Sequence, residues 1–305
     1  MSNPIIAIVW TYNPDVKLLA EVLSSTFGIV NGIVVVDNGS ENVLGIKNTI
    51  RRLCPNALFI ELGFNSGVHA LNIGMHYALK MGAKWILLLD DDTVLIHEVV
   101  HKMLESFREL SVRSKDLCER IIAISLMTEV PYYLKKFEGS FVPFYTCGMF
   151  SGTFVKADAI RSGISIRENF FLDQADFDFF NRLRGNYITV QWIKEAMKHR
   201  LGKSYRGPLS NLRLPYIGAI RKYEDPFRYY YIVRNSTILL IERRIPLRHY
   251  AHQLVAYFIP LVIVHGLRKA INVLVLGLAH GILRKEGYLD LNIISSILKK
   301  DVAIN

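Results

Sequence analysis

Cysteine is scarce in this chain of 305 residues, and low-complexity segments are absent. The three cysteines, Cys54, Cys118 and Cys147, are scattered along the sequence and odd in number. This pattern argues against a disulfide framework or a zinc site of the Cys-x-x-Cys type, and it favours a reducing compartment. The 20 glycines and 10 prolines show no period, which excludes collagen-like and low-complexity architectures.

Long apolar runs are also lacking. The amino-terminal residues carry no charged leader and only a short apolar run, so no signal peptide or membrane span is expected there. Near the other end, Leu254–Val264 and Ile271–Leu283 are each shorter than the stretch of about 20 residues that spans a bilayer. Because basic residues flank these runs, we expect either helices lying in the plane of a membrane surface or a helical hairpin packed on the protein itself.

What the sequence does contain is a large apolar fraction and an uneven charge. Hydrophobic residues make up 51% and charged residues 21%, enough for a packed core in one large or two smaller domains. Residues 1–180 contain 16 Lys and Arg against 20 Asp and Glu, whereas residues 181–305 contain 21 against 7. The basic half suits anionic lipid, a phosphorylated substrate or a solvated surface. It shows no pattern of a nucleic-acid-binding motif, so no nucleic-acid partner is expected.

The first 125 residues alternate short apolar runs with stretches of helical periodicity. Strands are expected at residues 5–10, 32–36, 57–62, 85–89 and 121–125, and helices at 16–23, 42–53, 68–81 and 97–110. This alternation predicts a parallel, doubly wound sheet, whose ligands sit beyond the carboxyl ends of its strands. The polar clusters at 11–13, 37–40, 63–67 and 90–92 fall at those ends. Residues 201–225 are expected to form a long basic loop.

Three consecutive carboxylates, Asp90, Asp91 and Asp92, follow a buried apolar strand in the sequence ILLLDDDT. Such a cluster is costly to fold unless something neutralises it, and hard divalent cations take carboxylate oxygens as ligands. A metal that also binds diphosphate oxygens would do so, whereas a plain acidic turn is the common alternative. In IVVVDNGS, Asp37 suits a base or a ribose, or simply an Asp-Asn-Gly turn.

Two further segments place polar groups among glycines or aromatic residues. In residues 63–75, glycines permit close backbone approach and two asparagines offer amides, without a GxGxxG or Walker A pattern. In residues 170–180, Asp173 and Asp176 lie among five phenylalanines. If this segment is helical, the two carboxylates share a face, and apolar neighbours would raise a carboxylate pKa toward that of a useful base. The alternative is a pair of acids at the N-terminus of a buried helix.

One motif is typical of a different class of enzyme, the zinc peptidases. His97, Glu98 and His101 match the HExxH helix of zinc peptidases, which uses two histidines as ligands and a glutamate as base. The match directly follows the acidic strand end, and no further histidine close behind it completes a longer zinc signature. We therefore interpret it as a chance match.

Taken together and in order, these segments resemble the inverting family 2 glycosyltransferases of the GT-A fold, and most of all the rhamnosyltransferases, with galactofuranosyltransferases as relatives. The resemblance covers roughly residues 5–240, and LGLAHGILRKEG at 276–287 is similar to the tails of such enzymes. It is carried by TYN, VVVDNGS, the Asn65–Gly74 stretch, LLLDDDT, CGMFSGTFVKADAI, FFLDQADFDFFNRLR, His199 and YYYIVRN. The expected fold is therefore α/β, a Rossmann-like and mostly parallel sheet flanked by helices, with a helical, amphipathic C-terminal tail.

The resemblance also implies roles for single residues. Asp90 and Asp92 would be the DxD pair that holds Mg²⁺ or Mn²⁺ and, through it, the donor diphosphate, with His199 as a further metal ligand. Asp176 matches the catalytic base that takes the proton of the acceptor hydroxyl. The residues expected to bind substrate are Thr11, Tyr12, Asn13, Asp37, Asn38, Ser40, Asn65, Gly67, Asn72, Asp90, Asp91, Asp173 and Arg234.

The implied protein is a metal-dependent glycosyltransferase with a catalytic domain at 1–225 and a helical, membrane-associating region at 226–305. It would move a sugar, in the first place rhamnose, from dTDP-rhamnose or a UDP-sugar to a glycan or lipid-linked glycan in cell-surface polysaccharide synthesis. We expect it in the cytoplasm, peripheral at the anionic inner face of the cell membrane, with a homo-oligomer left open. The alternatives are a galactofuranosyl or other hexosyl transferase of the same fold, or a non-catalytic membrane subunit that binds nucleotide sugars.

Overall fold

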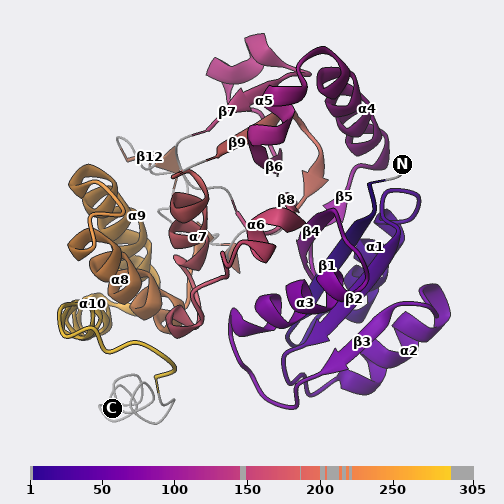
Figure 1. Ribbon diagram of the computed structural model, residues 1–305. Helices are drawn as coiled ribbons and strands as arrows, with labels where there is room; N and C mark the ends of the chain where they lie inside the picture. Colours follow the sequence, from indigo (N-terminus) through magenta and orange to yellow (C-terminus); the bar gives the residue numbers. More distant parts are fainter. Residues whose placement is uncertain are drawn as a thin grey trace. The chain divides into compact units, whose positions relative to one another are not determined.

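A computed structural model describes residues 3–144, 149–185, 187–199 and 223–289, together with the backbone at 203–204, 213–214, 218–219 and 222. The chain forms two compact units, which are described separately (Figure 1). Unit 1 comprises Met1–Ile166 and Phe179–Arg200, and unit 2 comprises Arg167–Asp178 and Leu201–Asn305. The segment 167–178 thus packs with the C-terminal residues, whereas the functional division at residue 225 stays a prediction.

Unit 1 is built on one eight-stranded sheet with the order β3-β2-β1-β4-β8-β6-β9-β7. Its strands are β1 (Ile5–Thr11), β2 (Gly32–Asp37), β3 (Leu58–Glu61), β4 (Trp85–Asp90), β6 (Ile121–Met127), β7 (Phe141–Pro143), β8 (Thr153–Lys156) and β9 (Ile188–Glu195). The five expected strands are present, and four neighbouring pairs are parallel. However, β8 inserts antiparallel between β4 and β6, and β7 pairs antiparallel with β9. The sheet is therefore mostly rather than wholly parallel.

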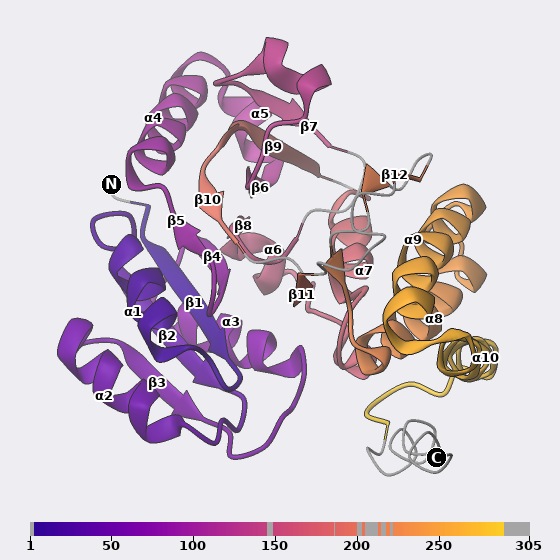
Figure 2. The same cartoon turned by 180° about the vertical axis from the view of Figure 1, so that it is seen from behind.

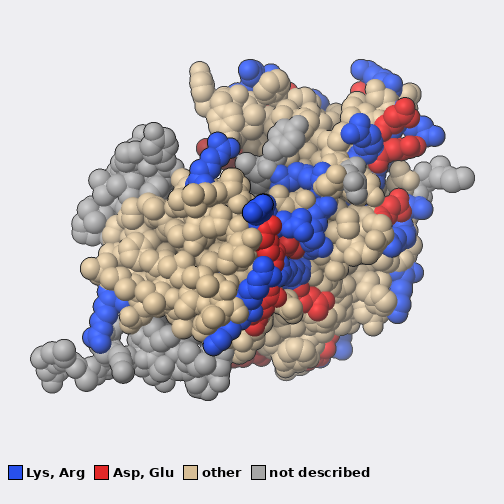
Figure 3. Space-filling model, turned by 60° about the vertical axis from the view of Figure 1, so that its left-hand side comes forward, with Lys and Arg blue, Asp and Glu red and all other residues tan. Residues whose placement is uncertain are grey.

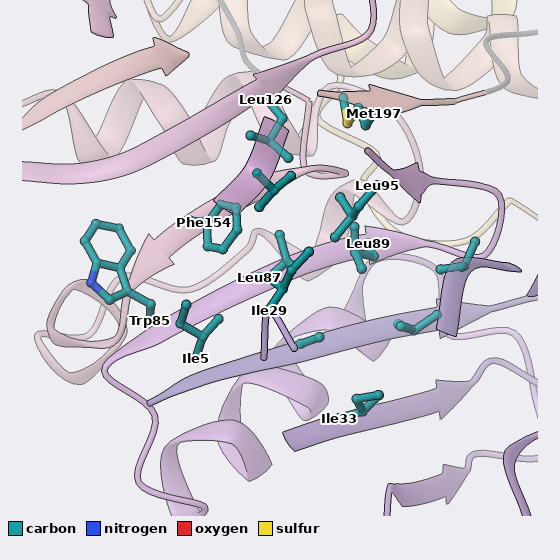
Figure 4. Packing of buried hydrophobic residues seen from close by; sticks show 14 of the residues in the cluster. Ile5, Ile29, Ile33, Trp85, Leu87, Leu89, Leu95, Leu126, Phe154 and Met197 are labelled. Carbon is teal, nitrogen blue, oxygen red and sulfur yellow. The ribbon is translucent and has the colours of Figure 1, made fainter. Parts of the chain in front are cut away.

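Helices cover both faces of the first four strands, because these strands are apolar on both sides. The helices of unit 1 are α1 (Val16–Ser25), α2 (Val43–Leu53), α3 (His69–Lys80), α4 (His97–Arg113), α5 (Lys115–Arg120), α6 (Ala157–Arg161) and the 3₁₀ turn η1 (Tyr132–Phe137). Apolar residues of α1, α2 and α4 join one face of the sheet in a single core, part of which is drawn in Figure 4. On the other face α3 approaches closely, since a Cβ on Gly74 would lie 2.5 Å from Ile8 Cγ2. That glycine serves packing within the fold.

The parallel register aligns the carboxyl ends of the central strands. Thr11 pairs with Asp37 across β1 and β2, and Trp10 pairs with Asp90 across β1 and β4. The polar clusters expected at the strand ends therefore share one edge of the sheet, as predicted. A small second ladder adds a distant residue to this edge: β5 (Val94–Leu95) pairs antiparallel with β10 (Met197–Lys198), which carries the chain into His199.

Among the described residues, the C-terminal part of unit 2 forms three long helices, seen from both sides in Figures 1 and 2. They are α8 (Pro226–Ile241), α9 (Leu247–His265) and α10 (Leu267–Ile282). α10 lies tightly against α8, since a Cβ on Gly277 would meet Val233 at 2.8 Å and one on Gly281 would meet Thr237 at 2.6 Å. Both C-terminal apolar runs are thus helical. No helix of the described residues combines the length and apolar character needed to cross a bilayer.

Two expectations about local structure need correction. In residues 201–225 the described parts form two short antiparallel ladders instead of a plain loop. The other residues of this segment lie outside the described part, apart from Glu224 and Asp225. The strands are β11 (Lys203–Ser204), β12 (Arg213–Leu214), β13 (Gly218–Ala219) and β14 (Lys222–Tyr223). The acidic segment is also not one helix. After the 3₁₀ turn η2 (Glu168–Phe170), α7 (Ala175–Leu183) begins only at Ala175, so Asp173 precedes the helix and does not share a helical face with Asp176.

Candidate active site

Two carboxylates and one imidazole converge at the end of β4. Asp90 is the last residue of the strand, Asp92 follows in the turn, and β10 presents His199 beside them. One ligand atom from each of these three residues lies within 4.8 Å of the others. Nε2 of His199 is 3.8 Å from Oδ2 of Asp90, and its Nδ1 is 2.9 Å from Oδ1 of Asp92. This is the set of metal ligands expected from the sequence, now brought together in space.

The donor set fits a divalent cation. Mg²⁺ and Mn²⁺ favour carboxylate oxygens, and Mn²⁺ also accepts an imidazole nitrogen. Oδ1 of Asp92 is buried and accepts no hydrogen bond among the described residues. Leaving a buried carboxylate oxygen without a donor is costly, so a cation at this point would satisfy it.

Two buried hydroxyls orient the ligands, and the sequence analysis missed both. Thr93 Oγ1 lies 2.7 Å from Nδ1 of His199 and 2.6 Å from Ser151 Oγ. Ser151 Oγ in turn accepts the backbone N–H of Asp90 at 2.8 Å. Nδ1 of His199 lies 2.7 Å from Thr93 Oγ1 and 2.9 Å from Asp92 Oδ1, and the contact with Thr93 has the geometry of a hydrogen bond. Nε2 of His199 lies on the side of Asp90 and would be the nitrogen left to hold a cation.

Asp91, the middle carboxylate of the motif, is a weaker acid than an ordinary aspartate. Burial raises the pKa of Asp91 to about 7, and the neighbouring charges of Asp90 and Asp92 add to this, while the N–H of Tyr12 lowers it. That N–H donates to Oδ2 of Asp91 at 3.1 Å. Asp91 thus ties the end of β1 to the end of β4. Trp10 Nε1 donates to Oδ1 of Asp90 and makes a second such link.

Asp37 lies at the end of β2 and is fully buried. Its Oδ1 accepts the hydroxyl of Thr11 at 2.9 Å, and its Oδ2 accepts the backbone N–H groups of Gly39 and Ser40 at 3.2 and 3.0 Å. Of the two interpretations left open above, this geometry matches the Asp-Asn-Gly turn. Gly39, at φ +80°, is required there because a Cβ would lie 2.7 Å from the backbone of Phe64. Contact of Asp37 with a nucleotide stays a prediction.

The asparagines at this edge connect the loops that follow β1, β2 and β3 by hydrogen bonds. Asn13 Oδ1 accepts the N–H of Glu41 at 2.8 Å, while the N–H of Asn13 donates to Ser40 Oγ at 2.8 Å. Asn38 donates to the carbonyl of Gly67 at 3.0 Å and accepts the N–H of Ser66 at 2.7 Å. Asn65 Oδ1 accepts the N–H of Gly67 at 2.9 Å. The structure therefore brings these expected binding residues to one place, where they shape the loops.

Asn72 lies elsewhere on α3. Its side chain donates to the carbonyl of Ile166 at 2.8 Å and accepts the N–H of Ile166 at 2.9 Å. This pair of hydrogen bonds holds the last residue of the first segment of unit 1. The expected contact of Asn72 with substrate stays a prediction.

The other expected site residues belong to unit 2. Asp176 is partly buried in the first turn of α7. Asp173 pairs with Arg228, whose Nη2 donates to Oδ1 at 2.6 Å and whose Nε donates to Oδ2 at 3.2 Å. Arg234 is 1% exposed, and it donates to backbone carbonyl groups of Phe170 and Gly287. The surroundings of Arg234 and Asp173 are thus protein groups of the same unit.

The HExxH residues form no comparable centre. His97 Nε2 is 2.8 Å from the carbonyl oxygen of Phe27, and His101 Nε2 is 3.2 Å from His97 Nε2. Within the described part of the chain, the metal-ligand group of three or more members is Asp90, Asp92 and His199. The interpretation of the motif as a chance match stays a prediction.

Comparison with known proteins gives the same family as the motifs. Residues 6–155 match the model of glycosyl transferase family 2. Over 271 residues the chain is 26% identical to the dTDP-rhamnosyl transferase RfbF of Shigella flexneri, covering 81% of this chain and 83% of that protein.

Two crystal structures of S. aureus TarS share the fold. TarS 1-349 is 16% identical, with a TM-score of 0.51 over 86% of this chain and 72% of that one. The longer TarS chain is 14% identical, with a TM-score of 0.52 over 97% of this chain and 55% of that one. The mostly parallel sheet flanked by helices is accordingly GT-A-like, as expected. Residues 6–155 thus form a glycosyl transferase family 2 domain, and the chain as a whole is similar to a rhamnosyltransferase.

Proposed function

We propose that the protein is an inverting glycosyltransferase that moves rhamnose from a nucleoside diphosphate donor to a hydroxyl of a glycan or lipid-linked glycan in cell-surface polysaccharide synthesis. The observation that carries the proposal is the convergence of Asp90, Asp92 and His199 at the end of β4 in a family 2 domain. The relative from Shigella flexneri, named a dTDP-rhamnosyl transferase, supports rhamnose as the sugar.

The loops at the ends of β1, β2 and β3 are proposed to bind the nucleoside. Their backbones are cross-linked by Asp37, Asn38 and Asn13, so the surface is preorganised for a ligand. Two aromatic side chains on these loops are exposed, Tyr12 at 52% and Phe64 at 63%. Exposed aromatic rings beside polar loops suit stacking on a nucleobase.

The proposed chemistry is a single displacement. The acceptor oxygen forms a bond to the anomeric carbon as the bond from that carbon to the diphosphate oxygen breaks, and the acceptor proton passes to the carboxylate of Asp176. Asp90, Asp92 and His199 would hold Mg²⁺ or Mn²⁺. When bound, such an ion supplies positive charge where negative charge develops on the leaving diphosphate. No covalent sugar–enzyme intermediate is required, which gives inversion at the anomeric carbon.

The test compares donors and variants in one assay. Purified protein with Mn²⁺ or Mg²⁺ would be supplied with dTDP-rhamnose, UDP-galactofuranose and UDP-glucose, with release of nucleoside diphosphate as the readout. Asp176→Asn is expected to lower turnover by about 10²- to 10⁴-fold without loss of donor binding. Asp158→Asn is the matched control, since this carboxylate is exposed and pairs only locally with Arg161.

Each outcome of this assay distinguishes the proposed function from an alternative. Turnover with UDP-galactofuranose or UDP-glucose in place of dTDP-rhamnose would replace the proposed donor. Donor binding that persists without turnover, after glycan and lipid-linked acceptors have been supplied, would support the non-catalytic subunit. Absence of binding to every nucleotide sugar would refute the proposal.

The location is proposed from unit 2, at the anionic inner face of the cell membrane. Four apolar side chains form an exposed stripe along one side of α10, at 57%, 42%, 57% and 64% exposure: Leu267, Ile271, Val275 and Ile282. Figure 3 shows a broad uncharged face whose border carries Lys and Arg together with Asp and Glu. A helix with an outward apolar stripe and basic neighbours such as Arg268 and Arg284 suits an anionic lipid surface.

Vesicle binding tests this location. The protein is expected to cosediment with vesicles of phosphatidylcholine and phosphatidylglycerol, and less with phosphatidylcholine alone. The double variant Ile271→Glu/Val275→Glu should lose binding, because two charges would enter the apolar stripe. Val112→Glu is the control, since Val112 is 86% exposed in unit 1. Equal binding by the double variant and the wild type would contradict the proposal.

A further inference from the structure

The four residues before α7 adopt an unusual backbone. Phe171, Asp173 and Gln174 have φ values of 61°, 50° and 62°, although none of them is glycine. Side chains other than glycine rarely take this left-handed conformation, because Cβ crowds the neighbouring carbonyl. This left-handed turn, residues 171–174, leads directly into Ala175 and Asp176 at the start of α7. Such a backbone persists only when surrounding groups hold it.

Asn235 of α8 stabilises this backbone conformation by hydrogen bonds. Its side chain is fully buried, and the two hydrogens of its Nδ2 are shared among three carbonyl oxygens: those of Phe170 at 3.1 Å, Leu172 at 2.7 Å and Asp173 at 2.9 Å. Three carbonyl groups so close in sequence can face one amide only if the backbone turns sharply. The left-handed conformation of the turn and the amide of Asn235 therefore depend on each other.

Arg234 fixes the direction of that amide. Its Nε donates to Oδ1 of Asn235 at 2.9 Å, so the NH₂ group of Asn235 must face the turn. Its Nη2 donates to the carbonyl of Phe170 at 3.0 Å, and its Nη1 donates to the carbonyl of Gly287 at 2.6 Å. The guanidinium also lies 4.6 Å from the ring centre of Tyr231. Each nitrogen of Arg234 thus has an acceptor within unit 2.

The far end of the turn is held by a charge pair. Arg228, two helical turns before Asn235 on α8, donates to both carboxylate oxygens of Asp173. This carboxylate and that of Glu224 raise the pKa of Arg228 further above its ordinary value. One face of α8 therefore contacts the turn at both of its ends, immediately before the proposed base.

We infer that Arg234 and Asn235 are positioning residues for Asp176: from α8 they hold the left-handed turn 171–174 and thereby set the first turn of α7, where Asp176 lies. The inference rests on the proposed role of Asp176 as the catalytic base. It replaces direct contact of Arg234 with substrate by an action through the backbone. It also gives a physical reason for the Arg-Asn pair that ends the YYYIVRN segment.

A double-mutant cycle tests this action. Asn235→Ala is expected to lower turnover about 100-fold, the loss typical of a misplaced catalytic group, with nucleotide affinity unchanged. In a chain that already carries Asp176→Asn, the same substitution should have no further effect, because Asp176 transmits it. Asn235→Asp keeps the shape of the side chain but replaces its donors by oxygen, and should behave like Asn235→Ala. A general loss of structure would instead lower turnover in both backgrounds.

Ser236→Ala is the matched control. Ser236 is buried on the same helix and donates only to the carbonyl of Val233 in the preceding turn, so its loss should leave turnover within about twofold. Hydrogen exchange of the amides at 170–178 supplies a readout independent of activity. It should be faster in Asn235→Ala and unchanged in Ser236→Ala.

The outcomes separate this inference from the function on which it rests. Unchanged exchange in Asn235→Ala, or an equal further loss of turnover in the Asp176→Asn background, would overturn the positioning role. Full turnover of Asp176→Asn would remove the proposed base, whatever the exchange data show. Faster exchange together with a non-additive loss of turnover would establish the positioning role.

Discussion

Two polar clusters lie in the two units, and they differ in how their charges are matched. The strand-end cluster of unit 1 consists of Asp90, Asp91, Asp92 and His199, and crowds three carboxylates around one imidazole. The α8 cluster of unit 2 pairs opposite charges, with Arg228 on Asp173, and it saturates Arg234 with backbone carbonyl groups. Crowded like charges destabilise a fold, whereas completed pairs and hydrogen bonds specify it.

This contrast separates two motifs that look equivalent in sequence. LLLDDDT and YYYIVRN both place charged side chains next to buried apolar runs. The first offers ligand atoms that fit a cation, among them Oδ1 of Asp92, which is buried and accepts no hydrogen bond among the described residues. The second is complete as it stands. We therefore expect substitutions in the first cluster to impair function directly, and those in the second to impair stability and to act on turnover only through the position of Asp176.

The largest effect is expected for Asp92→Asn. Removing one ligand charge should lower metal-dependent turnover at least about 100-fold, because a metal ion contributes several kcal/mol of charge stabilisation. Thermal stability of the metal-free protein should stay equal or rise, since one of three crowded carboxylates is lost. Asp116→Asn, on the exposed surface of α5, controls for the loss of a charge. Lower stability with retained turnover would reverse the comparison.

The second expected effect is on folding. Arg234→Met should lower the free energy of unfolding by about 3 kcal/mol, because the carbonyl groups of Phe170 and Gly287 would lose a charged donor inside the protein. Urea or thermal unfolding of the full chain measures this loss. The exposed Arg248→Met should change stability by no more than about 0.5 kcal/mol. Equal stability of the two variants would show that the α8 cluster is not structural.

A third substitution acts on the orientation of a metal ligand. Thr93→Val keeps the shape of the side chain but removes the oxygen that lies in line with His199 Nδ1, and should weaken Mn²⁺ binding about 10- to 100-fold. Calorimetric or spectroscopic titration with Mn²⁺ reads this directly. Thr153→Val is the matched control, because Thr153 is also buried but its hydroxyl contacts Ser125 and a backbone carbonyl. Unaltered Mn²⁺ affinity in Thr93→Val would show that His199 needs no such support.

The sequence was informative where local patterns decide the structure. Apolar runs ended by polar clusters predicted the central strands, and the parallel register then aligned Thr11, Asp37 and Asp90 at one edge. Strand β8 was not anticipated, because nothing in its four residues tells which strands will flank it. His199 is placed beside Asp92 by a ladder of only two residue pairs, which is too short to be predicted from local patterns. Its expected role as a metal ligand therefore came from the family resemblance.

Long-range partners explain the remaining errors. The spacing of Asp173 and Asp176 fits a helix, yet the structure starts α7 at Ala175. The left-handed turn before it depends on Asn235, some 60 residues later, which no local pattern reveals. The hydroxyls of Thr93 and Ser151 were missed for the same reason, since a single buried hydroxyl has no sequence signature.

The smallest expected effect is a loss of stability of unit 2 at low pH. Burial, helped by the positive charges of Lys285 and Arg234, lowers the pKa of His280, whose Nδ1 lies 2.8 Å from the hydroxyl of Tyr230. The unfolded chain binds a proton near pH 6.5 and the folded chain only below that, so stability should fall as pH drops through 6.5.

His280→Gln keeps a hydrogen-bond acceptor for Tyr230 but cannot be protonated in this range. Its free energy of unfolding should therefore fall less between pH 7.5 and 5.5 than that of the wild type, by a difference below about 1 kcal/mol because the imidazole is only partly buried. The exposed His76→Gln is the control and should follow the wild type. A parallel fall in wild type and His280→Gln would mean that His280 does not contribute to the acid sensitivity. The α8–α10 interface, with its buried apolar side chains and the close contacts of Gly277 and Gly281, would then be insensitive to the charge of His280.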